Sequence, residues 1–270
     1  MNFIEIDSGK IAYRDRGTGN VTLVFLHGNS LSSQTYEHQF SGSLSDNFRL
    51  LALDFPGHGD SSDAADPSAT YSFPGYASAM WEALETLGVK APVLVGHSLG
   101  GNVALEMAGS DRETAGLMVI GTYPPNGDPA CFMDGATPGF SPKLAFQETH
   151  SDEEAGAIAA FAMGGGGKEV PDYTFENLRR TDGRARVHLG ESIAAGNYSD
   201  QTALVASYSR PIAMILGGND GYVSRDYLNS LNWANLWGGE IQILEGCGHT
   251  PFVDDPQTFD GLLCDFANAT

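Results

Sequence analysis

The chain has 270 residues, 41% of them hydrophobic and 10% aromatic, which is enough to bury the core of one large domain without covalent or metal support. Its formal net charge of −20 at pH 7 argues against nucleic acid or an anionic membrane surface as a partner, because both attract positive charge. We therefore expect a small neutral molecule as the substrate.

The N-terminal residues contain neither the basic nor the apolar segment of a signal peptide, and no apolar run approaches the about 20 residues of a membrane span. We expect a soluble cytoplasmic protein, either a monomer or a weak homodimer. Its three cysteines are widely separated and form no CxxC pair, and its histidines lack metal-binding spacing. We therefore expect no disulfide, no metal and no cofactor.

Strand and helix patterns alternate along the chain. Residues 3–16 predict a β-hairpin, since alternating apolar residues flank Ser8-Gly9. Later apolar runs predict strands buried on both faces of a parallel sheet; they cover 21–26, 49–53, 92–96, 116–120, 212–216 and 240–244. Helices are expected at 33–44, at 72–87, directly after Ser98 and from 256 to about 268. The alternation predicts an α/β fold with a mostly parallel, doubly wound sheet of about eight strands, whose ligands bind beyond the carboxyl ends of the strands.

The strand pattern stops at Gly121 and resumes at Ile212. The intervening residues are first rich in Pro and Gly and then contain helical patterns without a buried strand. We expect residues 1–121 and 209–270 to form the core, and 122–208 to form a mainly helical cap above the catalytic edge. Within this cap, Gly164-Gly165-Gly166-Gly167-Lys168 lacks the first glycine and the final hydroxyl residue of a phosphate-binding loop, so we expect a flexible joint.

A possible nucleophile follows one of the buried strands. The sequence Pro92-Val93-Leu94-Val95 leads into Gly96-His97-Ser98-Leu99-Gly100 and then into a helical pattern. Small residues on both sides of a serine allow a tight strand-turn-helix bend, which exposes the hydroxyl at the start of the helix. We predict that Ser98 is a nucleophile in such an elbow.

A serine hydroxyl needs a general base, and the base needs an acid that orients it. His249 lies in a loop of small residues directly after the last predicted strand, and Asp220 directly follows the strand that ends at Leu216. The order Ser98, Asp220, His249 is that of α/β-hydrolase triads. Asp226 is a weaker candidate for the acid, because it should lie within the next helix.

An anionic tetrahedral intermediate requires oriented hydrogen-bond donors, each contributing roughly 3 to 4 kcal/mol. We expect the backbone N–H groups of Leu99 and Asn29 to form this oxyanion hole. The side chain of Asn29 could contact the substrate or only brace its loop. Further candidate substrate contacts are His97, beside the nucleophile, and aromatic residues that could line an acyl pocket or belong to the core of the cap: Tyr123, Phe132, Phe140, Phe146 and Phe161.

The motifs together resemble the α/β-hydrolase superfamily over the whole chain. The resemblance rests on His27-Gly28, on Asp54-x-Pro56-Gly57-His58-Gly59-x-Ser61, on the elbow and on the positions of Asp220 and His249. It implies the fold and the triad but not the substrate.

Other motifs resemble the metal-free N-acyl-homoserine lactonases of this fold, which open the lactone of bacterial quorum-sensing signals. These are His27-Gly28-Asn29-Ser30, Gly121-Thr122-Tyr123-Pro124-Pro125, Arg180-Thr181-Asp182-Gly183-Arg184-Ala185-Arg186, Asn235-Leu236-Trp237 and Gly248-His249-Thr250-Pro251-Phe252. Two positions depart from that family, which has tryptophan in place of His97 and glutamate in place of Asp220. The arginine-rich motif alone could be an anion clamp or a salt-bridged helix junction.

The resemblance implies a quorum-quenching lactonase. Ser98 would attack the lactone carbonyl, Leu99 and Asn29 would hold the oxyanion, and His249 would protonate the ring oxygen and activate water. The alternatives are a carboxylesterase for small acyclic esters and a signal receptor built on a hydrolase scaffold. The acidic nucleophile of dehalogenases and epoxide hydrolases is excluded by the serine at position 98.

Overall fold

The computed structural model describes residues 1–163 and 169–270, so the glycine run at 164–168 lies outside the described residues. One sheet of eight strands forms the centre of the molecule, in the order β1-β2-β4-β3-β5-β6-β7-β8. In chain order the strands are β1 (Asn2–Ile6), β2 (Gly9–Arg16), β3 (Thr22–Leu26), β4 (Arg49–Leu53), β5 (Val93–His97), β6 (Gly116–Ile120), β7 (Ile212–Gly217) and β8 (Gln242–Leu244).

The sheet has the predicted mixture of strand directions. β1 and β2 form the expected hairpin, and β2 also runs antiparallel to β4. All other neighbouring strands are parallel, from β4 through β3, β5, β6 and β7 to β8. The carboxyl ends of β3, β5, β6, β7 and β8 therefore meet at one edge, and the loops that follow them converge there.

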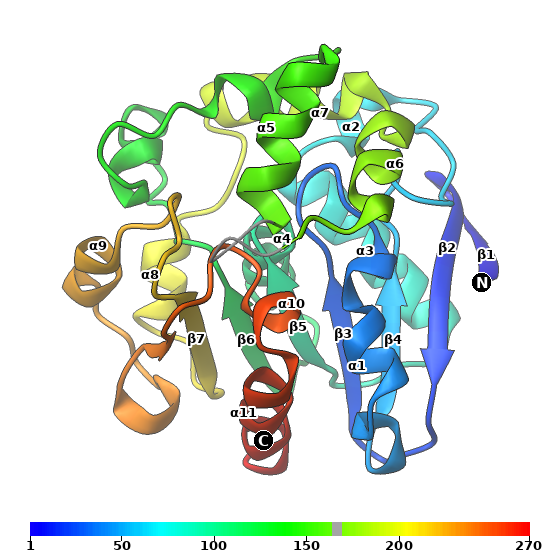
Figure 1. The fold of residues 1–270 in the computed structure, drawn as a ribbon. Helices are drawn as coiled ribbons and strands as arrows, with labels where there is room; N and C mark the ends of the chain where they lie inside the picture. Colours follow the sequence, from blue (N-terminus) through cyan, green and yellow to red (C-terminus); the bar gives the residue numbers. More distant parts are fainter. Residues whose placement is uncertain (164–168) are drawn as a thin grey trace.

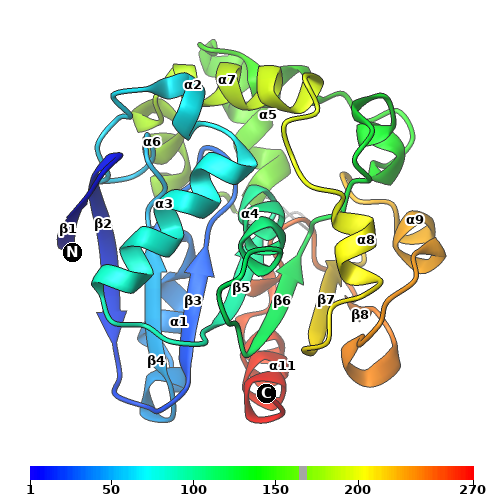
Figure 2. The same cartoon turned by 180° about the vertical axis from the view of Figure 1, so that it is seen from behind.

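Helices cover both faces of the sheet (Figures 1 and 2). One face carries α1 (Glu37–Ser41), α10 (Pro251–Asp254) and α11 (Pro256–Asn268), and the other carries α3 (Phe73–Thr86), α4 (Leu99–Ala108) and α8 (Gln201–Val205). Alternate strand residues contribute to the two cores: Phe25 packs with Phe40 and Phe259, whereas Val24 belongs to the cluster that contains Met80. Burial on both faces explains the continuous apolar runs in the sequence.

Two predicted elements are shorter than expected. The helix predicted at 33–44 is divided into η1 (Ser33–Tyr36), α1 and η2 (Leu44–Asp46). Gly42 interrupts it with an extended backbone, φ −81° and ψ −167°, as is common for glycine between serines, which favour turns over helix interiors. The last strand begins at Gln242 rather than at Glu240, because only three pairs join it to β7 at the edge of the sheet.

Between β6 and β7 the described residues are mainly helical. The elements are η3 (Pro129–Gly135), η4 (Pro142–Phe146), α5 (Asp152–Met163), α6 (Asp172–Arg180), α7 (Gly183–Ala194) and α8. Figure 1 shows α5, α6 and α7 above the carboxyl edge of the sheet, near the short helix α2 (Pro67–Thr70). The remaining helices are α9 (Arg225–Ser230) and η6 (Trp237–Gly239). Among the described residues, no helix is long and apolar enough to span a membrane.

Helix α4 approaches the strands so closely that only glycine fits at the contact. A Cβ atom on Gly100 would lie 2.1 Å from the carbonyl oxygen of Leu26 in β3, and one on Gly96 would lie 2.3 Å from the carbonyl oxygen of Gly100. Both obstacles are backbone atoms, which cannot rotate away as a side chain can. The glycines that flank Ser98 therefore fix the distance between the helix and the sheet.

We predict that Gly100→Ala lowers the free energy of unfolding by about 1 to 3 kcal/mol, because α4 must move away from β3 to accommodate the methyl group. Urea unfolding followed by circular dichroism measures the change. Gly261→Ala in α11 is the matched control: a Cβ atom there meets nothing within 4 Å, so this variant should keep or slightly raise stability. Equal stability of the two variants would contradict this account of the glycine.

Candidate active site

Ser98 occupies a strained turn between β5 and α4. Its backbone angles are φ 52° and ψ −117°, a region that residues with a side chain seldom adopt and that costs of the order of 1–3 kcal/mol. The turn is held by the Ser98 backbone N–H, which donates to the carbonyl of Ile120 at 2.9 Å, and by the Thr122 hydroxyl, which donates to the Ser98 carbonyl at 2.9 Å. This conformation matches the elbow expected from the sequence.

The structure brings His249 and Asp220 together. His249 Nδ1 lies 2.9 Å from Asp220 Oδ2, and the Asp220 side chain is fully buried. Its second oxygen, Oδ1, accepts hydrogen bonds from the backbone N–H groups of Tyr222 at 2.7 Å and Val223 at 3.2 Å. Burial alone would raise the pKa of Asp220, but the neighbouring imidazole and these hydrogen bonds outweigh it, and the pKa is lowered. The carboxylate is therefore ionised and fixes the orientation of the ring.

The loop that carries His249 is fixed from two sides. The backbone N–H of Gly248 donates to Asp254 Oδ2 at 2.7 Å. On the other side, His97 Nε2 lies 3.0 Å from the His249 carbonyl oxygen, and the two imidazole rings are 4.7 Å apart. Burial lowers the pKa of His97 well below its usual value, so the neutral ring donates this hydrogen bond. His97 was expected to contact substrate; it lines the cavity, but only 1% of it is exposed, and its resolved contact holds the His249 loop.

Asn29 lies in the loop after β3, opposite the start of α4. Its side-chain Nδ2 donates to the carbonyl of Ala145 in η4 at 2.9 Å, so it connects this loop to the helical segment above. The neighbouring Ser30 has a left-handed backbone with φ 60°, and its hydroxyl lies 3.3 Å from Nη1 of the buried Arg186. The side chain of Asn29 therefore braces its loop. Because Asn29 also lines the cavity above Ser98, its contact with the substrate stays a prediction.

His27 supports the same loop from below. Its Nδ1 donates to the carbonyl of Gly28 at 2.8 Å, and its Nε2 accepts from the backbone N–H of Phe55 at 3.1 Å. Burial, only partly offset by Asp54, lowers the pKa of His27. Burial also lowers the pKa of the neighbouring His58 to about 3. Both imidazoles are therefore neutral structural groups.

The arginine-rich motif is a helix junction. Arg180 pairs with Asp63 at 3.0 Å, and Asp182 pairs with Arg184 at 2.8 Å while accepting from the Tyr71 hydroxyl at 2.7 Å. Arg186 does not line the cavity. It donates to the main-chain carbonyls of Gln147 and Glu148, which directly follow η4. These contacts join α6 and α7 to the core, which agrees with the salt-bridged junction and not with the anion clamp.

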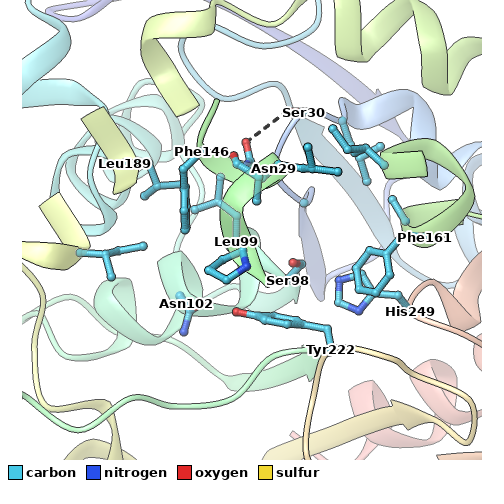
Figure 3. A pocket seen from close by; sticks show the side chains of 18 of the residues that line it. Asn29, Ser30, Ser98, Leu99, Asn102, Phe146, Phe161, Leu189, Tyr222 and His249 are labelled. Carbon is cyan, nitrogen blue, oxygen red and sulfur yellow. Dashed lines mark hydrogen bonds between the residues drawn. The ribbon is translucent and has the colours of Figure 1, made fainter. Parts of the chain in front are cut away.

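A mainly apolar cavity lies over Ser98 (Figure 3). The catalytic candidates Ser98, His249, Leu99 and Asn29 line its base. Apolar side chains of the helical segment and of α3 enclose it: Phe73, Phe132, Met133, Phe140, Pro142, Leu144, Phe146, Ile158, Phe161, Leu189 and Ile193. Phe161 lies over the His249 ring at a centroid distance of 5.5 Å. The expected aromatic lining is therefore present at positions 132, 140, 146 and 161.

The prediction that Tyr123 contacts the substrate is wrong. It does not line the cavity and is 2% exposed, because it packs behind Tyr222 at a centroid distance of 5.3 Å. The lining residue is Tyr222, which the sequence analysis missed together with Asn102, Leu189 and Ile193. The position of Tyr222, two residues after Asp220, could have indicated it, as could the i, i+4 spacing of Leu189 and Ile193 on one face of a helix.

No group of three or more His, Cys, Asp or Glu side chains arranged to hold a metal ion occurs among residues 1–163 and 169–270.

Comparison with known proteins identifies the family. The family model described as the alpha/beta hydrolase family matches residues 23–261, which span the elbow and both candidate triad partners. The chain belongs to the alpha/beta hydrolase family. Its eight-stranded, mostly parallel sheet with helices on both faces agrees with this membership.

Solved structures and curated proteins add three similarities. A crystal structure of the N-acyl homoserine lactonase AidH in complex with N-butanoyl homoserine is 34% identical, with a TM-score of 0.92, over 98% of this chain and 96% of that one. The pimeloyl-[acyl-carrier protein] methyl ester esterase of Yersinia pseudotuberculosis is 27% identical over 93% of this chain and 95% of its own length. An esterase from Exiguobacterium antarcticum, at 19% identity and a TM-score of 0.79 over 98% of each chain, shares the fold.

We predict that acidification destabilises the folded hydrolase before its carboxylates titrate. His27, His58 and His97 have lowered pKa values in the folded chain because they are buried, whereas in the unfolded chain each takes up a proton below about pH 6.5. The stability that depends on keeping these imidazoles neutral is therefore fully present above about pH 6.5 and is lost as the pH falls below this value. At pH 5.5 the loss should be about 1.4 kcal/mol each for His58 and His97, and His27 should add to it.

Urea unfolding at pH 7.5, 6.5 and 5.5 measures this loss, and His58→Asn should reduce the loss at pH 5.5 by about 1.4 kcal/mol relative to the parent chain. A free energy of unfolding that stays constant or rises between pH 7.5 and 5.5 would contradict the assignment of three neutral buried imidazoles.

Proposed function

We propose that this hydrolase opens the lactone ring of N-acyl homoserine lactones, using Ser98 as nucleophile, His249 as general base and acid, and Asp220 as the orienting carboxylate. The observation that carries the proposal is the similarity to the lactonase AidH, which includes the helical segment over the cavity as well as the core. Function depends on the site and not on the fold alone, so a similarity that includes the segment enclosing the cavity supports a shared substrate class better than a similarity of the core alone.

The first step is attack by Ser98 Oγ on the lactone carbonyl carbon, with transfer of the hydroxyl proton to His249 Nε2. The negative charge that develops on the carbonyl oxygen is stabilised by the backbone N–H groups of Leu99 and Asn29. Leu99 is the first residue of α4, so its N–H group also carries the positive end of the helix dipole. Asp220 stabilises the imidazolium that forms.

Ring opening follows when the bond between the carbonyl carbon and the ring oxygen breaks. His249 donates its proton to that oxygen, which becomes the hydroxyl of the homoserine side. The product of this step is an acyl-enzyme whose leaving group is still attached to it, so the hydroxyl can attack the ester and reform the lactone. Water activated by His249 must therefore reach the ester faster than the ring recloses.

Hydrolysis of the ester adds water to the carbonyl carbon and returns the proton to Ser98, releasing N-acyl-homoserine. This product carries a carboxylate that the neutral substrate lacked. None of the described cavity residues is a lysine or an arginine, and the chain as a whole has a net charge of −20. We expect the anionic product to be bound more weakly than the lactone, which favours its release.

We also propose that residues 122–208 form the cap of this site, with 1–121 and 209–270 as the core, except that α8 at the end of the segment lies on the face of the sheet with α4. Phe146, Phe161 and Leu189 of this segment enclose the cavity. The Asn29 side chain of the core donates a hydrogen bond to the carbonyl of Ala145 in the same segment. An apolar enclosure of this kind suits an acyl chain, which gains about 0.8 kcal/mol for each buried methylene.

A second candidate function is a carboxylesterase for acyclic esters. It is favoured by the similarity to the Yersinia methyl ester esterase over nearly the whole chain. The same Ser98, His249 and Asp220 would act, but an alcohol would leave the site before water enters.

We predict that the purified protein releases one proton for each N-hexanoyl homoserine lactone opened, and that Ser98→Ala lowers kcat by at least about three orders of magnitude because no nucleophile remains. Proton release in a weakly buffered solution, with the product verified by mass spectrometry, measures both rates. A p-nitrophenyl ester is assayed in parallel. Turnover of the ester alone would favour the carboxylesterase, and undiminished ring opening by Ser98→Ala would exclude the serine mechanism.

A further inference from the structure

The cavity contains two polar side chains that the proposed chemistry does not use, Tyr222 and Asn102. Both line it together with Ser98, and the surrounding wall is mainly aliphatic and aromatic. A polar group in an otherwise apolar pocket fixes the orientation of a ligand and determines specificity. These two groups are therefore candidates to contact a polar part of the substrate.

Tyr222 is held rigidly in the loop that carries the candidate acid. Its backbone N–H donates to Asp220 Oδ1 at 2.7 Å, and its ring packs against Phe140, Tyr123 and His249 at centroid distances of 4.7, 5.3 and 5.6 Å. Burial raises the pKa of Tyr222 to about 12, so the group is a neutral phenol. It therefore keeps its proton at neutral pH and can donate a hydrogen bond.

Asn102 lies on α4, one turn after Ser98, and is also fixed. Its Nδ2 donates to the Tyr123 carbonyl at 3.0 Å and to Gln201 Oε1 at 2.9 Å. These two bonds use both amide hydrogens. Figure 3 shows the Tyr222 hydroxyl directed towards Asn102, so the two residues form one polar region in the cavity wall.

The position of His249 orients the substrate relative to this polar region. The ring oxygen must face His249, which protonates it, so the carbon on the other side of the attacked carbonyl faces away from His249. In Figure 3 the Tyr222 hydroxyl and Asn102 lie on the opposite side of Ser98 from His249, as does Leu189. In an N-acyl homoserine lactone that carbon carries the amide nitrogen, and the acyl chain continues beyond it.

We propose that the Tyr222 hydroxyl donates a hydrogen bond to the amide carbonyl of an N-acylated substrate and so selects N-acyl lactones over lactones without an amide. This assignment rests on the proposed function. It makes Tyr222 a specificity-determining residue. The Tyr222 oxygen accepts a hydrogen bond from the Tyr123 hydroxyl, and a substrate without the amide leaves the Tyr222 hydrogen without its ligand partner, which disfavours binding. The acyl chain then lies against Leu189 and Phe146, which line the same cavity.

The test compares two lactones with Tyr222→Phe and with a matched control. The lactones are N-hexanoyl homoserine lactone and an α-alkyl-γ-butyrolactone of equal chain length, in which methylene groups replace the amide. We expect Tyr222→Phe to lower the ratio of the two kcat/KM values about tenfold, mainly through KM for the amide substrate. The control, Tyr227→Phe, removes a hydroxyl that donates to the Pro124 carbonyl at 2.8 Å and does not line the cavity; it should keep the ratio of the parent enzyme.

The outcomes separate this inference from the proposed function. If the parent protein opens the N-acyl lactone and Tyr222→Phe keeps the ratio, the inference is wrong and the lactonase proposal stands. If the parent protein opens neither lactone, the lactonase proposal fails. The role of Tyr222 is then tested with two acyclic esters of equal length, N-hexanoylglycine methyl ester and a fatty acid methyl ester. The ratio of their kcat/KM values is compared between the parent protein and Tyr222→Phe. An unchanged ratio in Tyr222→Phe would overturn it there as well.

Discussion

The strained turn at Ser98 is the constraint on which the site depends. A serine with φ near +52° is unfavourable in isolation and persists only where its surroundings determine the backbone. Here β5 fixes one side of the turn by pairing with β3 and β6, and α4 fixes the other by packing on β3 at a distance that only glycine at position 100 permits. The core of the fold thus holds the hydroxyl and the first N–H groups of the helix in one place.

The remaining site residues are positioned by hydrogen bonds between loops. His97, the last residue of β5, donates a hydrogen bond to the carbonyl of His249, so the end of β5 is joined to the loop after β8 beside the cavity. Asn29 joins the loop after β3 to the segment above the site, and the buried Arg186 reaches the same loop through Ser30. A displacement of the helical segment would therefore be transmitted to the proposed oxyanion hole, which couples enclosure of the substrate to the geometry of the reaction.

The sequence predicts the core of this molecule better than the segment above it, for physical reasons. Strands buried on both faces give continuous apolar runs, and a strand-turn-helix elbow requires glycines at fixed positions, so β3 to β7 and the turn at Ser98 could be recognised locally. The break at Gly42 and the late start of β8 depend on weak local preferences and on edge pairing. The position of Tyr222, two residues after Asp220, places it near the site, but the sequence does not exclude Tyr123 from the cavity wall. Two aromatic residues from distant loops compete for the same surface, and packing decides which of them lies in front.

The central claim is that lactone opening proceeds through a covalent bond to Ser98. Treatment with an alkyl fluorophosphonate, followed by peptide mapping, tests it most directly because the adduct does not hydrolyse during the experiment. The account predicts one equivalent of label on Ser98, loss of ring opening in proportion to labelling, and slower labelling in the presence of saturating lactone. Retention of full lactone turnover by protein labelled completely at Ser98 would contradict it.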